Sequence, residues 1–265
     1  MIILIPMGGK SSRFKKAGIK INKAFLPVTC RFTGKKVPMA ISALRDIPWL
    51  RDKKNKLICV NRPEHHKNGT EKKIKSFFKN TIFIHDYVML DQAYACFLAR
   101  DELLKGDELF IGACDNGFDL DMNNFKNISK NSDAVIFTHV GDSNIERNPN
   151  AHSWIKVKKG TSIASKLVLK NTISKNFMRD HATTGMFWFK DSKVFLESLE
   201  KMIWAKDTLD GKYYVDNVIN YLIKNKKSVK VIEVKYHCWG TPEDYFIYEK
   251  TIDYWKSFYQ KINGK

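Results

Sequence analysis

The chain has 265 residues, of which 43% are hydrophobic and 12% aromatic, so it is long enough to bury a full α/β core as one domain. Its formal net charge of +18 raises nucleic-acid binding as a function, but the lysines are scattered and we find no RNA-binding aromatic motif or helix-turn-helix signature. No apolar run approaches the ~20 residues of a membrane span, and no basic leader precedes the first strand, so we expect a soluble, cytoplasmic protein that binds neither membrane nor nucleic acid.

An uninterrupted apolar run at residues 2–5 opens the chain and leads through Pro6-Met7 into Gly8-Gly9-Lys10-Ser11-Ser12-Arg13. Such a run predicts a buried parallel strand whose C-terminal end enters a tight turn, which is where open α/β sheets bind ligands. The glycines let the backbone approach a ligand, the serines offer N–H and hydroxyl groups, and Arg13 offers a fork of donors that matches a phosphate. The loop is therefore suited to a nucleoside triphosphate. A plain glycine turn with a solvated basic residue is the alternative.

Two common phosphate-binding motifs do not fit this loop. The third glycine of the dinucleotide fingerprint is missing, and no Gly-Lys-Ser/Thr closes a Walker spacer. A nicotinamide-dependent dehydrogenase would also need an acidic residue about twenty residues after the loop, and residues 22–36 contain none.

Further apolar runs predict strands over residues 57–60, 81–84, 109–114 and 134–140, and helical spacing predicts a helix over 71–78. We interpret the adjacent His65 and His66 as surface residues, because neighbours diverge on a helix. Asp91 is predicted to cap the helix that follows it. The run 109–114 ends in Asp115, at the C-terminal end of a central strand, where a divalent cation can bridge a carboxylate to phosphates. A turn made by Asp-Asn-Gly is the alternative at this position.

The second half of the chain is less regular. Alternating strands are expected over residues 148–157 and 165–170, an aromatic strand with a glycine over 181–189, helices over 192–204 and 213–224, a strand over 229–234 and a C-terminal helix over about 243–262. The five cysteines are widely spaced, odd in number and form no Cys-x-x-Cys pair, so neither a disulfide framework nor a zinc site is indicated. Cys59, Cys96 and Cys114 lie in apolar segments and are predicted to be core residues.

The loop Gly-Gly, then Ser-Arg-Phe, then Lys23-Ala24-Phe25-Leu26-Pro27-Val28, resembles the signature of the sugar-phosphate nucleotidylyltransferases. Two serines before Arg-Phe make it most similar to the branch found in bacterial capsule gene clusters. Further elements that match in order are Gln92-Ala93, the strand ending at Asp115, Lys170, the strand around Gly185 and the run Trp239-Gly240-Thr241-Pro242-Glu243-Asp244. The resemblance implies a single-domain GT-A-like (Rossmann-like) α/β fold with a mixed, mostly parallel sheet flanked by helices, in which residues of about 1–145 bind the nucleotide and about 146–245 bind the acceptor.

The resemblance also implies roles for individual residues. Arg13 and Lys23 would be catalytic, on the triphosphate and at the reacting phosphates. The expected nucleotide-binding residues are Met7, Gly8, Gly9, Lys10, Ser11, Ser12, Gln92, Ala93 and Cys114, and the expected acceptor-binding residues are Lys170, Gly185, Trp239 and Gly240. Asp115 would bind Mg²⁺ (or Mn²⁺). Cys238 replaces a second aspartate of many members and is a poor magnesium ligand, so either water and phosphate oxygens or another carboxylate such as Asp216 would complete the site.

The chain departs from the family pattern at two places. Asn22 and Ala24 replace two prolines beside Lys23, and Leu169 replaces a glutamate that commonly touches a sugar. The expected reaction joins a nucleoside triphosphate, with CTP favoured, to a phosphorylated small-molecule acceptor and releases pyrophosphate. CDP-L-glutamine, made for the phosphoramidate modification of a capsule, is the favoured product. A sugar-1-phosphate cytidylyl- or guanylyltransferase and a non-catalytic basic nucleic-acid-binding protein are the alternatives, and a homodimer is left open.

Overall fold

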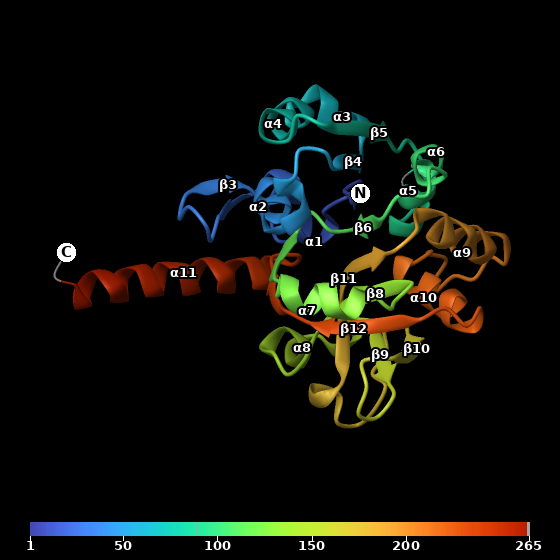
Figure 1. Ribbon diagram of the computed structural model, residues 1–265. Helices are drawn as coiled ribbons and strands as arrows, with labels where there is room; N and C mark the ends of the chain where they lie inside the picture. Colours follow the sequence, from blue (N-terminus) through green and yellow to red (C-terminus); the bar gives the residue numbers. More distant parts are fainter. Residues whose placement is uncertain (89, 264–265) are drawn as a thin grey trace.

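The computed structural model describes residues 1–88 and 90–263 (Figure 1). The strands are β1 (Ile2–Pro6), β2 (Pro27–Thr29), β3 (Lys36–Pro38), β4 (Lys56–Asn61), β5 (Thr81–His85), β6 (Leu109–Ile111), β7 (Asn116–Asp119), β8 (Ala134–His139), β9 (Trp154–Val157), β10 (Ala164–Val168), β11 (His181–Phe189), β12 (Val229–Glu233) and β13 (Lys235–Cys238). The helices are α1 (Ser12–Lys16), α2 (Met39–Asp46), α3 (Pro63–Lys67), α4 (Thr70–Phe77), α5 (Gln92–Leu98), α6 (Arg100–Leu103), α7 (Met122–Ser129), α8 (Ser143–Arg147), α9 (Ser192–Trp204), α10 (Val215–Lys224) and α11 (Pro242–Ile262).

A nine-stranded sheet runs through the centre of the molecule in the order β10-β9-β11-β6-β1-β4-β5, with β8 paired to β11 and β12 paired to β8. The pairs of β1 with β4 and β6, of β4 with β5 and of β8 with β12 are parallel. β11 runs antiparallel to β6, β8 and β9, and β10 runs antiparallel to β9. Within this described sheet β10 and β11 therefore oppose the other strands, and the predicted mixed, mostly parallel α/β fold is confirmed.

The apolar first strand explains the layered core. Because successive side chains of a strand point to opposite faces, Ile2 and Leu4 enter one hydrophobic cluster, and Ile3 and Ile5 enter the other. The first cluster is covered by α5, α6, α9 and α10, and the second by α2, α4 and α7. In Figure 1 the orange helices α9 and α10 and the blue α2 lie on opposite sides of the strands.

Two short antiparallel pairs lie outside the main sheet, and their pairing joins segments far apart in sequence. β7 pairs with β13, with Gly117 opposite His237, and β2 pairs with β3. β13 begins at Lys235, directly after the predicted strand over 229–234, and it brings the Trp239-Gly240 turn next to Asp115: Trp239 N donates to Asp115 O over 3.0 Å.

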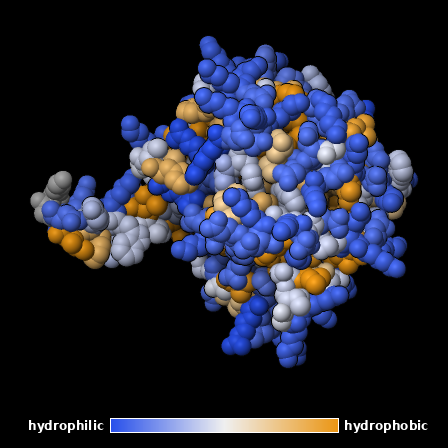
Figure 2. Space-filling model, in the orientation of Figure 1, coloured by the Kyte–Doolittle hydropathy of each residue, from blue (hydrophilic) through white to orange (hydrophobic). Residues whose placement is uncertain are grey.

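The predicted C-terminal helix is confirmed as α11, which extends away from the body of the molecule (Figures 1 and 2). Its first half is fixed to β2: Glu249 accepts hydrogen bonds from the N–H and hydroxyl of Thr29, each over 2.7 Å, and the Tyr248 hydroxyl donates to Thr29 O over 2.8 Å. Its second half carries exposed Tyr254, Trp255 and other apolar residues.

Two sequence predictions about single residues have different outcomes. The interpretation of His65 as a surface residue is wrong, because its side chain is buried and packs edge-to-face on Phe25 with ring centroids 5.4 Å apart; His66, as expected, is exposed. Asp91 is confirmed as an N-cap, since its carboxylate accepts from Tyr94 N over 2.9 Å. Among the described helices, none is long and apolar enough to cross a membrane.

Candidate active site

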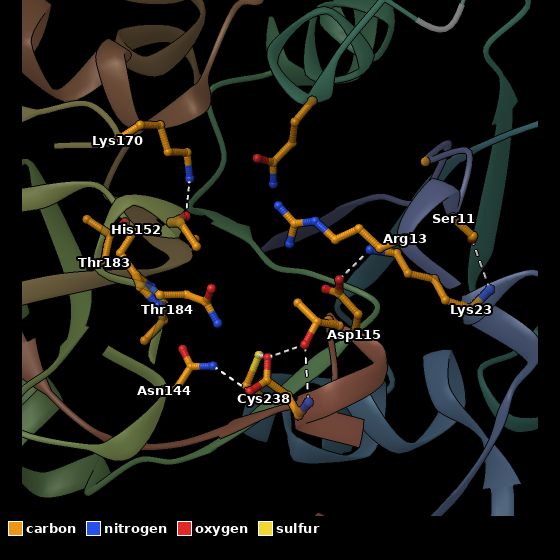
Figure 3. A pocket seen from close by; sticks show the side chains of 18 of the residues that line it. Ser11, Arg13, Lys23, Asp115, Asn144, His152, Lys170, Thr183, Thr184 and Cys238 are labelled. Carbon is orange, nitrogen blue, oxygen red and sulfur yellow. Dashed lines mark hydrogen bonds and ion pairs between the residues drawn. The ribbon is translucent and has the colours of Figure 1, made fainter. Parts of the chain in front are cut away.

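The turns after β1, β6 and β13 meet at one point (Figure 3). β1 and β6 are parallel neighbours, with Leu4 opposite Ile111, so their C-terminal ends lie side by side and place Gly9 and Asp115 at the same edge. Lys23 Nζ forms an ion pair with Asp115. A Cβ atom at Gly240 would lie 3.1 Å from Asp115 Oδ2, and one at Gly9 would lie 3.9 Å from Lys23 Cε. The three turns therefore surround the Lys23–Asp115 pair.

Local hydrogen bonds fix the backbone of Lys23. The Ser11 backbone is left-handed, with φ of 54°, and its hydroxyl accepts from Lys23 N over 3.0 Å. The Asn22 side chain accepts from Ala24 N over 3.0 Å and caps the short 3₁₀ turn Lys23–Phe25. Asn22 and Ala24 stand where the resembling family has prolines, and the Asn22 cap supplies an ordered turn without them.

The electrostatics of the cleft keep the Lys23 side chain protonated. Burial by itself lowers the pKa of Lys23, but the adjacent Asp115 carboxylate, together with the nearby Cys114 and Cys238, holds the pKa of Lys23 above its ordinary value. Burial and the nearby Asp115 carboxylate raise the pKa of the Cys114 thiol to about 12. The cleft therefore presents a fixed ammonium and a carboxylate beside a neutral thiol.

A cleft with two adjoining regions lies around the pair. The first region is a cavity of about 430 Å³ and the second of about 590 Å³, which are the sizes of small-ligand pockets. The regions share Gly9, Lys10, Lys23, Gln92, Asp115, Thr184 and Gly185. The second region adds Met7, Gly8, Asp86, Ala113 and Cys114, and the first adds Ser11, Ser12, Arg13, His152, Lys170, Thr183, Asp216 and Gly240. Lys23 and Asp115 thus stand at the junction between two compartments.

Arg13 and Lys170 contribute positive charge to the first compartment. Among the described residues no carboxylate forms an ion pair with Arg13, whose side chain is exposed in the cleft and points across it in Figure 3. Lys170 Nζ donates to Ala151 O over 2.6 Å and lies 5.3 Å from the centroid of the Tyr214 ring. Burial lowers the pKa of Lys170, Asp216 opposes this effect and Arg13 adds to it. An anionic ligand in this compartment would relieve the repulsion between Arg13 and Lys170.

Asp216 lies on the Lys170 side of the cleft and not beside Cys238. Its carboxylate is buried and accepts from the Thr183 hydroxyl over 2.7 Å. Its role as a metal ligand stays a prediction. The carboxylate next to Cys238 belongs to Asp244, which accepts from Cys238 Sγ over 3.5 Å, from Asn144 Nδ2 over 2.9 Å and from Arg147 Nη2 over 2.6 Å.

Asn144, His152, Thr183, Thr184 and Asp244 line the cleft, but the sequence reasoning gave none of them a place in the site. They come from α8, the turn before β9, β11 and α11, and no local pattern joins these elements. Asp244 belongs to the Trp-Gly-Thr-Pro-Glu-Asp run, and this motif could have predicted its place in the cleft. Two predicted site residues, Ala93 and Trp239, are fully buried and line neither cleft region, and their roles stay predictions.

The donor set around Asp115 fits Mg²⁺ bound together with substrate. Mg²⁺ is held in many phosphate-transfer sites by one or two carboxylates, with waters and substrate phosphates as the other ligands. Asp115 supplies one carboxylate, in the cleft and partly exposed. Burial and the neighbouring Asp244 raise the pKa of the Cys238 thiol to about 12, and sulfur is a soft donor that suits Mg²⁺ poorly.

Comparisons with known proteins identify the fold. No protein-family model matches the chain, and no curated protein matches it. A nucleoside-diphosphate-sugar pyrophosphorylase from Vibrio cholerae superposes with a TM-score of 0.75 at 19% identity, over 94% of this chain and 99% of that one. The chain shares this fold. The inositol-1-phosphate CTP transferase of T. maritima matches with a TM-score of 0.62 at 16% identity, over 94% and 93% of the two chains. HddC from Yersinia pseudotuberculosis superposes with a TM-score of 0.64 at 17% identity, over 94% of this chain and 98% of that one.

Proposed function

We propose that the chain is a nucleotidyltransferase that joins a nucleoside triphosphate to a phosphorylated acceptor and releases pyrophosphate. The observation that supports this most directly is the position of the Lys23–Asp115 pair at the junction of two compartments. A group-transfer enzyme needs such an arrangement, because its two substrates must meet at the reacting phosphorus. The solved structures of the same fold carry names of this reaction class, which adds to the proposal.

In this reaction a phosphate oxygen of the acceptor forms a bond to the α-phosphorus, and the bond from the α-phosphorus to the bridging oxygen of the β-phosphate breaks. Pyrophosphate leaves with the electron pair of that bond. The acceptor phosphate is already ionised, so little acid–base chemistry is needed and positioning with charge stabilisation carries the rate. Lys23 and Arg13 would stabilise the charge on the triphosphate, and Lys170 would hold the acceptor phosphate.

The nucleoside would lie in the second compartment, with its triphosphate passing the shared Gly9-Lys10 turn toward Arg13 in the first. The Gly8-Gly9 backbone leaves room for close approach of phosphates: a Cβ at Gly8 would find its nearest neighbour, Asp86 Oδ2, only at 3.7 Å. Gln92, at the first position of α5, would contact the base. Mg²⁺ bound at Asp115 would neutralise charge that develops on the transferred phosphoryl group. Lys23 already pairs with that carboxylate and would turn toward the phosphates when they arrive.

CTP is the nucleotide that we favour, and phosphoglutamine is the acceptor, so that the product would be CDP-L-glutamine for capsule modification. The Ser-Ser-Arg-Phe loop and the Trp-Gly-Thr-Pro-Glu-Asp run support this choice through their resemblance to capsule-pathway enzymes. Leu169 supports it as well, since it replaces the glutamate that commonly touches a sugar. A structure of the same fold is named as a CTP transferase.

The experiment measures pyrophosphate release by the purified chain with Mg²⁺, each of the four ribonucleoside triphosphates and a panel of acceptors. The panel contains phosphoglutamine, glucose 1-phosphate and inositol 1-phosphate, with unphosphorylated glutamine as the control. Release with CTP and phosphoglutamine supports the full proposal. Release with another pair overturns the substrate choice and keeps the reaction class. No release from any pair overturns the reaction class.

A further inference from the structure

A second cluster of polar side chains lies outside the cleft, at the edge of the sheet formed by β5. His66 on α3, Glu71 on α4 and His85 at the end of β5 come together there, and their ligating atoms all lie within 4.8 Å of one another. His66 Nδ1 lies 2.8 Å from Glu71 Oε2, and His85 Nε2 lies 2.6 Å from Glu71 Oε1. Among the described residues this is the only group of three histidine, cysteine or acidic side chains with such spacing.

We propose that His66, Glu71 and His85 bind a zinc-class divalent metal ion. Two imidazole nitrogens and a carboxylate are donors that suit Zn²⁺ and neighbouring first-row ions, whereas Mg²⁺ prefers oxygen ligands alone. Bonds of about 2.0–2.2 Å to a tetrahedral zinc ion place two ligand atoms roughly 3.4 Å apart. The two observed histidine–carboxylate separations, 2.8 and 2.6 Å, are shorter than this value, and all the ligating atoms lie within 4.8 Å of one another, so small outward side-chain movements would admit the ion.

The surroundings support a preformed site. Asn61 Nδ2, at the end of β4, donates to Glu71 Oε1 over 2.9 Å and orients the carboxylate, as outer partners of metal ligands do. The Glu71 side chain is only 12% exposed, whereas that of His66 is 70% exposed. Water or a further ligand can therefore take the remaining position from the solvent side.

The local sequence explains why only one of the two adjacent histidines takes part. His65 and His66 diverge on α3, so that His65 packs on Phe25 in the interior while His66 reaches Glu71 across the α3–α4 turn. β5 pairs in parallel with β4, and Asn61 is opposite His85, which places both residues at the same end of the edge strands. The three ligands thus come from three elements, and the ion would link α3 and α4 to β5.

This site is separate from the Asp115 site in both position and chemistry. None of the three residues lines either region of the cleft. Asp86, which follows His85 directly, does line the second region. An ion at His85 would therefore stabilise the end of the strand that leads into the nucleotide compartment.

The test uses the full chain, stripped with a chelator and then titrated with Zn²⁺ alone, with calorimetry for the affinity and stoichiometry and thermal unfolding for stability. We expect one Zn²⁺ per chain at this site and a rise in the unfolding temperature. His66→Ala should weaken binding by more than about 100-fold, since loss of an outer partner alone costs 10–100-fold. Because His66 is exposed, this variant should fold as the wild type does. His85→Ala should have the same effect on binding.

The matched control is His237→Ala. His237 Nε2 lies 3.2 Å from Asp119 Oδ2, and among the described residues this histidine–carboxylate pair has no third ligand and lies outside the cleft lining. The His237→Ala variant should bind Zn²⁺ with the affinity of the wild type. Replacement of Zn²⁺ by Co²⁺ adds a spectroscopic reading, since ligand-field bands should be lost in His66→Ala and kept in His237→Ala. Saturable binding that is unchanged in His66→Ala and His85→Ala, or no saturable binding by the wild type, would overturn the site and show a plain hydrogen-bonded cluster.

Discussion

The Lys23 ammonium pairs with the Asp115 carboxylate across 92 positions of sequence, at the edge of the sheet where β1 and β6 end. The pair is partly buried, with side chains 21% and 19% exposed, in a cleft that holds further positive charge from Arg13 and Lys170. An arrangement of this kind is ready for a polyanion and a divalent cation, because phosphates can take the ammonium while the cation takes the carboxylate.

Asp115→Asn should lower pyrophosphate release by about 10²–10³-fold, the range found when one group that stabilises transition-state charge is removed. The amide keeps the size of the side chain but removes its charge, so the proposed metal ligand and the partner of Lys23 are lost together. Asp101→Asn is the control, since the Asp101 side chain is 88% exposed and outside the cleft lining. An equal loss of pyrophosphate release in the two variants would show that Asp115 takes no part in the reaction.

Arg13→Ala and Lys170→Ala should differ in which substrate they affect. Arg13 would contact the triphosphate, so its removal should raise the KM for the nucleotide by about tenfold or more, the equivalent of one charge-assisted hydrogen bond. Lys170 would hold the acceptor, so its removal should raise the KM for the acceptor by a similar factor. Steady-state kinetics with each substrate varied in turn checks this. A rise for the same substrate in both variants would contradict the assignment of Arg13 to the triphosphate and of Lys170 to the acceptor.

Gly117→Ala should destabilise the fold. A Cβ at this position would lie 1.8 Å from Asp46 Oδ2 and 3.1 Å from the Trp239 ring. The Asp46 carboxylate cannot move freely, because it accepts from Arg31 Nε over 3.1 Å and from Phe118 N over 3.2 Å. We expect a loss of about 1–3 kcal/mol in the free energy of unfolding, as for other overpacked interiors.

Urea unfolding of the purified chain measures this loss. Gly8→Ala provides the stability control, since the nearest atom to its new Cβ would be 3.7 Å away. A midpoint for Gly117→Ala equal to that of Gly8→Ala would show that the Asp46 and Trp239 side chains adjust without cost.

His152 should make stability depend on pH. Burial, together with the nearby His139 and Lys170, lowers the pKa of His152 from 6.5 to about 4 in the folded chain. Above pH 6.5 both states hold a neutral ring and the full stability is present. As the pH falls from 6.5 toward 4, the unfolded state takes up the proton first, and about 3 kcal/mol of stability is lost. Unfolding free energies of the wild type and His152→Gln at pH 7 and pH 4.5 isolate this slope, which should be smaller in the variant. An equal loss of unfolding free energy between pH 7 and pH 4.5 in the two proteins would exclude His152 as the source of the pH dependence.

Local patterns were enough to predict much of the fold. The apolar runs at residues 2–5, 57–60 and 81–84 form β1, β4 and β5, and the helix predicted over 192–204 has those bounds as α9. These elements were predictable because each one buries a continuous or periodic set of side chains in the two core clusters. The strand β11 was also predicted over its full length, since it ends in three consecutive buried aromatic residues, Phe187, Trp188 and Phe189.

The parts that were not predicted depend on contacts between distant segments. β7 is short and pairs with β13 from the far end of the chain, so neither strand has a sequence signal apart from its partner. The burial of His65 follows from the position of Phe25, and the neighbours of Asp244 come from α8. The convergence of Gly9, Asp115 and Gly240 was expected from the order of the motifs, and the contacts around Asp115 confirm it.

The most direct test of the nucleotidyltransferase proposal is pyrophosphate release by Lys23→Ala, assayed beside the wild type with CTP, Mg²⁺ and the acceptor that the wild type prefers. Lys15→Ala, an exposed substitution on α1, is the matched control for loss of one lysine. The prediction is a fall of at least about 10²-fold for Lys23→Ala, with the circular dichroism spectrum of the wild type and with Lys15→Ala unaffected. Wild-type turnover by a folded Lys23→Ala would contradict the account.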